Sequence, residues 1–174
     1  MSFLKRIFGE RRERAALEPL YRAVVAAGRD PFWYREGGVP DTLDGRFDVI
    51  ASLLALVLLR MERDGDSARA AEVLLAEVFI DDMDGTVRQM GIGDHVVGKH
   101  VGRMMGALGG RLGAFRDAGG DEAGFAGAVE RNVFRGAAPS DPALALVAGR
   151  LGSFRDGLAG LSLADLLAGR IERP

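Results

Sequence analysis

Acidic side chains gather at two places in this sequence, and carboxylates are the first residues to consider for chemistry. One group is Asp81-Asp82-Met83-Asp84, and an earlier group consists of Asp41, Asp44 and Asp48. In an all-helical enzyme, aspartates on two facing helices can hold Mg²⁺ against a diphosphate. The two groups therefore raise the alternative of a magnesium-dependent enzyme of the isoprenoid or lipid class.

Arginines near these aspartates favour a different interpretation. Arg46, Arg88 and Arg103 lie close to the two acidic groups in the sequence, and we expect them to neutralise the carboxylates in buried or half-buried ion pairs. No further set of Lys or Arg then remains to receive the phosphates of a substrate. We therefore favour ion pairing and partner binding over a metal site.

Few other residues could carry catalysis or bind a metal ion. The chain has no Cys and only two His, His95 and His100, whose spacing puts them on different faces of a helix. The sequence contains no Glu-x-x-His pair of a di-iron site, no Walker loop, no dinucleotide fingerprint and no nucleophile elbow. We predict a protein that is not an enzyme and that has no catalytic residue, metal or cofactor.

Length, charge and hydropathy narrow the class of protein further. A chain of 174 residues fits one domain, and its net charge of −2 does not attract DNA, so we expect no specific DNA binding. The longest apolar run, residues 53–59, is far shorter than the ~20 residues of a membrane span, and no secretory signal is visible. We expect a cytoplasmic protein, with a peripheral contact to the inner membrane as a further expectation.

Helical spacing recurs along the whole chain, and strand patterns are nearly absent. The sequence predicts an all-α, single-domain multi-helix bundle with short C-terminal covering helices. We divide it into an amphipathic basic N-terminal helix, 1–16, and an all-helical domain, 17–174, whose next helix starts near Pro19 and ends at Gly28. The long helices are expected at about 43–64, 68–90 and 94–118, and the short ones at about 121–135, 142–157 and 162–171.

Two apolar features outside the long helices each have two interpretations. In the N-terminal helix the large apolar side chains share one face among basic residues, and this face either contacts a membrane or docks on the bundle: Phe3, Leu4, Ile7 and Phe8. The aromatic turn Phe32-Trp33-Tyr34 either plugs one end of the bundle or lines a groove for a partner.

Two segments of the chain resemble the ubiquinol–cytochrome c chaperone family. Residues 34–48 (YREGGVPDTLDGRFD) are similar to its GVPDT-x-DGRFD block. Residues 78–84 (VFIDDMD), with RQMGIGD at 88–94 and VGK at 97–99, are similar to its second block, F-x-DMD…R-x-MG-V-GD…V-G-K. The similarity extends from about residue 21 to residue 110, and the chain after Gly119 carries no motif that we can match.

The resemblance implies a function in respiratory-chain assembly. Mitochondrial members of the family bind newly made cytochrome b and the translating ribosome, and they hold the subunit for haem insertion and assembly of the cytochrome bc1 complex. This chain is similar to bacterial members of the alphaproteobacterial type. The expected partner is therefore a protein client, cytochrome b or another bc1 subunit, with the ribosome as an additional partner. A peripheral membrane or ribosome adaptor that works through residues 1–16 is the remaining alternative.

A polar stripe on the helix at about 68–90 suggests where a client binds. Asp81, Asp84 and Arg88 follow one another at i, i+3 and i+7, on one face of that helix. We expect this stripe to lie beside the acidic start of the preceding helix, with adaptable methionines at the rim. The client-binding hypothesis comprises Tyr34, Asp41, Asp44, Arg46, Asp48, Asp81, Met83, Asp84, Arg88, Met90, Asp94 and Lys99.

Overall fold

The computed structural model describes residues 3–89 and 94–172, and it describes side chains for residues 12–85 and 102–172. Over these ranges the chain forms helices and no strand, as the sequence predicted. The elements are α1 (Phe3–Gly28), α2 (Phe32–Arg35), α3 (Leu43–Glu62), α4 (Asp66–Gln89), α5 (Asp94–Ala118), α6 (Glu122–Val133), α7 (Asp141–Ala159) and α8 (Leu163–Leu167).

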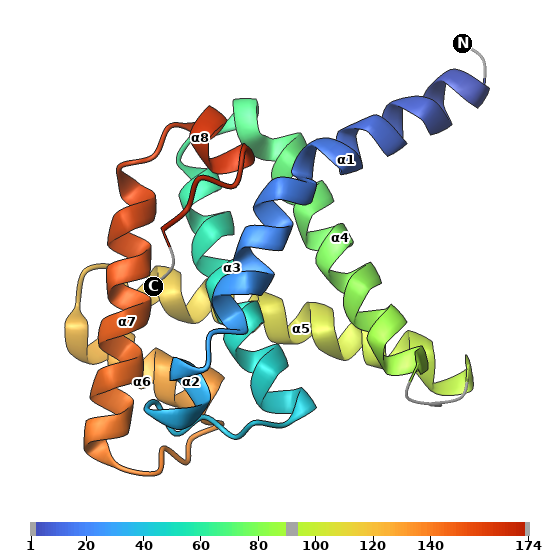
Figure 1. The fold of residues 1–174 in the computed structure, drawn as a ribbon. Helices are drawn as coiled ribbons and strands as arrows, with labels where there is room; N and C mark the ends of the chain where they lie inside the picture. Colours follow the sequence, from blue (N-terminus) through green and yellow to red (C-terminus); the bar gives the residue numbers. More distant parts are fainter. Residues whose placement is uncertain (1–2, 90–93, 173–174) are drawn as a thin grey trace.

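Helix α3 is the centre of the bundle. It contacts α1, α4, α5, α6 and α7, and Figure 1 shows α4 and α7 on opposite sides of it. Every residue from 48 to 58 is buried, because this stretch is apolar on nearly all faces and neighbours surround it. The side chains that α3 presents near its start are therefore held in fixed positions.

Helix α1 differs from the prediction. We expected one helix to end near residue 16 and another to begin near Pro19, but α1 runs without a break from Phe3 to Gly28 with Pro19 inside it. Pro19 removes one backbone hydrogen bond, whereas Leu17, Leu20 and Val24 are buried on both sides of it. Packing against α3 and α4 outweighs the local cost. The first turns of α1 extend beyond the body of the bundle (Figure 1).

The aromatic turn forms α2 and closes one end of the bundle. Trp33 is completely buried, and its Nε1 donates a hydrogen bond of 2.7 Å to the carbonyl of Ala27. The Tyr34 hydroxyl donates over 2.6 Å to the carbonyl of Gly28. Both bonds satisfy carbonyl groups at the C-terminal end of α1. The turn is therefore a plug, and Trp33 offers no surface to a partner.

The C-terminal helices do more than cover the core. Helix α7 contacts α3, and it contributes core side chains along one face: Val147, Leu151, Phe154 and Leu158. Arg60 fastens the end of α3 to the end of α7, because it donates hydrogen bonds to the carbonyls of Leu158 (3.1 Å) and Leu161 (2.5 Å). Those carbonyls lie at and just after the C-terminal end of α7, where a cation is favoured.

Candidate functional site

A cluster of charged side chains joins α3, α5 and the end of α6. Arg111 Nη2 donates to Asp48 Oδ1 over 2.6 Å, and Arg135 Nε donates to Asp48 Oδ2 over 2.7 Å. Arg135 also contacts Asp44, with 2.9 Å between Nη1 and Oδ2. Asp48 and Arg111 are 3% and 4% exposed. Each oxygen of the buried carboxylate therefore has its own guanidinium partner.

Local structure brings these residues together. Thr42 caps α3 by accepting a hydrogen bond from the Gly45 amide over 3.1 Å, which places Asp44 and Asp48 on the first two turns of the helix. Arg135 follows the C-terminus of α6 with a φ of 55°. That left-handed conformation is unfavourable for a residue with a side chain. The chain therefore reverses sharply where Arg135 reaches the aspartates.

Arg111 is anchored by further contacts. Its Nη1 donates to the carbonyl of Ala107 (2.9 Å), and its Nη2 donates to the carbonyl of Asn132 (2.6 Å). The guanidinium carbon lies 5.6 Å from the centre of the Phe47 ring, within cation–π distance. The Nε atom is buried and has no hydrogen-bond partner in the part of the chain that is described.

Burial and ion pairing shift the pKa values of this cluster in opposite directions. Burial raises the pKa of Asp48 above its ordinary value, although the hydrogen bond from Arg135 and the charge of Arg111 oppose that effect. Burial likewise lowers the pKa of Arg111, against the opposing charge of Asp48. The hydrogen bond to Asp48 raises the pKa of the more exposed Arg135. The cluster thus carries a considerable desolvation cost, which the ion pairs and hydrogen bonds among its members offset.

A cavity of about 620 Å³ opens beside the cluster, and we call it the arginine cavity. Its apolar wall comes from α3, α4 and α5: Leu43, Phe47, Met83, Met104 and Ala107. Its charged lining comprises Asp44, Asp48, Arg103, Arg111, Arg131 and Arg135, and Gly110 and Asn132 complete it. Phe47 is held in place by Phe79, at 5.6 Å between ring centres. The cavity therefore combines an adaptable apolar wall with a surplus of guanidinium groups.

Three residues of the client-binding hypothesis line this cavity: Asp44, Asp48 and Met83. Three others lie in a separate cleft of about 220 Å³ beside α2: Tyr34, Asp41 and Arg46. There Arg46 Nε contacts Asp41 Oδ1 at 2.7 Å, and its guanidinium carbon lies 5.8 Å from the Tyr34 ring. The hydrogen bond from Arg46 lowers the pKa of the Asp41 carboxyl.

The acidic group on α4 has partners on α1. Arg14 Nη1 contacts Asp81 Oδ2 at 2.6 Å, and the Tyr21 hydroxyl donates to Asp82 over 2.6 Å. Asp84 is half-buried and is not among the described residues that line the arginine cavity. In these contacts α4 faces α1, whereas the arginine partners of Asp44 and Asp48 come from α5 and from the end of α6.

The remaining predicted contacts lie outside the described side chains: Phe3, Leu4, Ile7, Phe8, Arg88, Met90, Asp94 and Lys99. Arg46 contacts Asp41 as expected, but both side chains of this ion pair are exposed rather than buried or half-buried. For Asp44 and Asp48, however, the partners seen are Arg111 and Arg135, which the sequence reasoning did not single out. Among the side chains that are described, no group of three His, Asp or Glu could hold a metal ion.

Arg111 had a signal in the sequence that could have been used. Met104, Leu108 and Phe115 mark the buried face of α5, and position 111 falls on the same face at steps of three and four residues. A charged residue at such a position needs a buried partner of opposite charge. Arg135 had no comparable signal, because its contacts depend on how the chain turns after α6.

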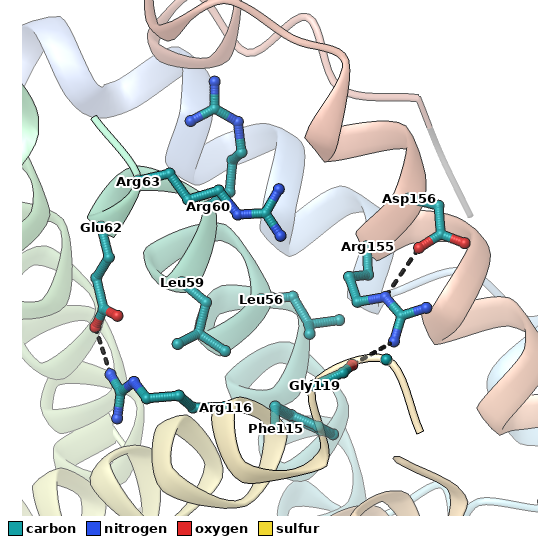
Figure 2. A pocket seen from close by; sticks show the side chains of 11 residues that line it. Leu56, Leu59, Arg60, Glu62, Arg63, Phe115, Arg116, Gly119, Arg155 and Asp156 are labelled. Atoms are coloured by element: carbon teal, nitrogen blue, oxygen red, sulfur yellow. Dashed lines mark hydrogen bonds and ion pairs between the residues drawn. The ribbon is translucent and has the colours of Figure 1, made fainter. Parts of the chain in front are cut away.

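A second cavity, of about 630 Å³, lies between the end of α3, the end of α5 and α7 (Figure 2). Two of its arginines link elements: Arg116 contacts Glu62 at 2.5 Å, and Arg155 donates to the carbonyl of Gly119 over 3.2 Å. Arg155 also donates to Asp156, its neighbour on α7, over 2.9 Å. These contacts stabilise the helix ends. We therefore take the arginine cavity as the stronger candidate site.

Comparisons with known proteins decide the family. Residues 35–173 match the family model described as "Ubiquinol-cytochrome C chaperone". The chain belongs to this family. The match includes Asp48, Arg111 and Arg135, and it extends through the C-terminal helices, for which the sequence offered us no motif. None of the helices among the described residues has the length and apolar character needed to cross a membrane.

A solved structure supports the assignment to the chaperone family. The fold is similar to the crystal structure of the Cbp3 homolog from Brucella abortus, with a TM-score of 0.80 and 28% sequence identity. The likeness covers 99% of this chain and 97% of that one. No curated protein matches the sequence significantly.

Proposed function

We propose that this protein is an assembly chaperone for the cytochrome bc1 complex, that it binds newly made cytochrome b, and that it catalyses no reaction. The family match over residues 35–173 carries the proposal. The charged site agrees with it, since guanidinium groups occupy both oxygens of Asp48 and leave none for a metal ion or a proton transfer. We place its action on the cytoplasmic side of the inner membrane, at the membrane surface.

We propose that the client contacts the mouth of the arginine cavity. A newly made membrane subunit exposes apolar side chains, and methionine side chains adapt to many apolar shapes. Met83 is half-buried and Leu43 is 39% exposed, so both can touch a partner without unfolding the bundle. The cleft of Tyr34, Asp41 and Arg46, and the acidic face of α4 with Asp81 and Asp84, form a polar surround in this proposal.

Complementation in a deletion strain tests the proposal. Leu43→Lys and Met83→Lys place a charge in the apolar mouth, and we expect both to lower assembled bc1 complex and cytochrome b haem several-fold. Val73→Lys is the matched control, because Val73 also lies on α4, is 56% exposed and does not line the cavity. Circular dichroism and thermal unfolding of the purified variants verify that each still folds.

The results distinguish a failure of the client site from a failure of the chaperone function. Normal bc1 assembly with folded Leu43→Lys and Met83→Lys would remove the cavity from client binding. Normal assembly in the deletion strain itself would refute the chaperone role. An effect of Val73→Lys as large as that of Met83→Lys would mean that the loss reflects added charge on α4 rather than the cavity.

A further inference from the structure

The arginine cavity holds more positive than negative charge among its described lining residues. Four arginines and two aspartates line it: Arg111 and Arg135 together engage both aspartates, and Arg103 has an interaction of its own. The side chain of Arg131 is exposed at the cavity and makes no hydrogen bond or ion pair with another described residue. The cavity therefore presents an uncompensated guanidinium group beside its apolar wall.

The other arginine of the cavity wall that is buried is already engaged. Arg111 is 4% exposed, and it donates to Asp48 and to the carbonyls of Ala107 and Asn132. A group that enters the cavity from outside therefore meets the exposed guanidinium of Arg131 rather than that of Arg111. A carboxylate is the group that this guanidinium pairs with best.

We propose that the arginine cavity recognises a carboxylate within an apolar segment of the client, that is, an Asp or Glu side chain flanked by large apolar residues. This inference rests on the proposed function and specifies which client segment binds. Guanidinium groups bind carboxylates through two parallel hydrogen bonds. The wall of Phe47, Met83 and Met104 then covers the apolar neighbours of that carboxylate. An acidic residue in a membrane segment is costly to leave unpaired, which gives a chaperone reason to hold it.

Two matched peptides test this directly. One is a fluorescent peptide of about 15 residues, long enough to form a helix, built of leucine, alanine and serine with one central glutamate. The other has glutamine at that position. By fluorescence anisotropy with the full chain, we expect the glutamate peptide to bind roughly five-fold more tightly, the size of a partly exposed ion pair. The preference should shrink as salt is raised.

Two variants of the protein are tested with the same two peptides. Arg131→Gln removes the free charge, and we expect it to abolish the preference for glutamate. Arg63→Gln is the control, because Arg63 lines the second cavity and its side chain makes no hydrogen bond or ion pair with another described residue. It should keep the preference unchanged. Both positions are exposed, so both variants are expected to fold.

The possible results distinguish this inference from the function on which it rests. Equal binding of both peptides, or a preference that survives Arg131→Gln, would overturn the recognition of a carboxylate and leave apolar client binding intact. A third peptide keeps the glutamate but replaces leucine with serine, and tight binding of that peptide would also overturn the proposal. If neither leucine peptide binds, the proposed client site fails as well.

Discussion

Asp48 on α3 and Arg111 on α5 form an ion pair inside the bundle, with 2.6 Å between Oδ1 and Nη2. Removing two such charges from water costs several kcal/mol for each ion, and the pair alone seldom recovers that cost. Here the hydrogen bonds of Arg111 to two backbone carbonyls and the second guanidinium, that of Arg135, add to the pair. This group of contacts therefore holds α3, α5 and the end of α6 in one arrangement.

Removing one member of this pair should cost more when it leaves a buried charge alone. Asp48→Asn keeps the volume but leaves Arg111 without its carboxylate, and we expect a loss of about 3–5 kcal/mol in the free energy of unfolding. Arg111→Met should cost less, because Asp48 keeps its contact with Arg135. Urea unfolding followed by circular dichroism measures both. The reverse order would mean that Arg135 does not stabilise Asp48 in solution.

The backbone conformation at Arg135 should reverse the usual order of stability, in which an alanine variant is more stable than a glycine variant. Both Arg135→Ala and Arg135→Gly lose the contacts to Asp44 and Asp48, but only glycine tolerates a φ of 55° without strain. We expect the glycine variant to be more stable by about 1 kcal/mol.

Four residues earlier, inside α6, the opposite order should hold. Arg131 lies in the last turn of α6, and Arg131→Ala should be more stable than Arg131→Gly by up to about 1 kcal/mol, because glycine weakens a helix. Urea unfolding of the four variants decides between them. The same order at both positions would contradict the left-handed conformation at Arg135.

Alkaline pH should destabilise the fold through its tyrosines. The chain has two, and burial raises the pKa of both, that of Tyr34 to about 12. Well below pH 10 both are protonated whether the chain is folded or unfolded. As the pH rises above 10, the unfolded chain loses these protons first, so the stability falls through the window between 10 and 12.

Tyrosinate absorbance and circular dichroism measure this effect together. We expect tyrosinate to appear well above pH 10 and in step with the loss of helix. In Tyr21→Phe and Tyr34→Phe the stability should depend less on pH in that window. Tyrosinate absorbance that rises near pH 10 while the helices persist would mean that the two hydroxyls are exposed to solvent.

The fold was largely predictable because burial leaves a periodic pattern. The central helix has apolar residues on almost every face, and its cap at Thr42 can be recognised locally. Pro19 misled the prediction of α1, since a local rule about proline does not include the packing of Leu17 and Leu20 against other helices.

The site was predictable only in part. Asp44, Asp48 and Met83, which the sequence reasoning grouped together, line one cavity. Their arginine partners were not, because an ion pair between residues 63 or 87 positions apart depends on how helices cross. For the same reason nothing in the spacing around Asp81 indicated that its partner would be Arg14.

A close contact between α1 and the turn after α8 yields the last prediction. Gly169 has a φ of 71°, and a Cβ atom there would lie 2.6 Å from the carbonyl oxygen of Pro19. Gly169→Ala must therefore adopt a left-handed conformation and push against backbone, and we expect a loss of about 2–4 kcal/mol. Gly149→Ala is the matched control, because Gly149 is exposed inside α7 with no neighbour within 4 Å of such a Cβ. It should gain up to about 1 kcal/mol. If urea unfolding shows the two variants to be equally stable, the C-terminal turn does not rest on α1 as described.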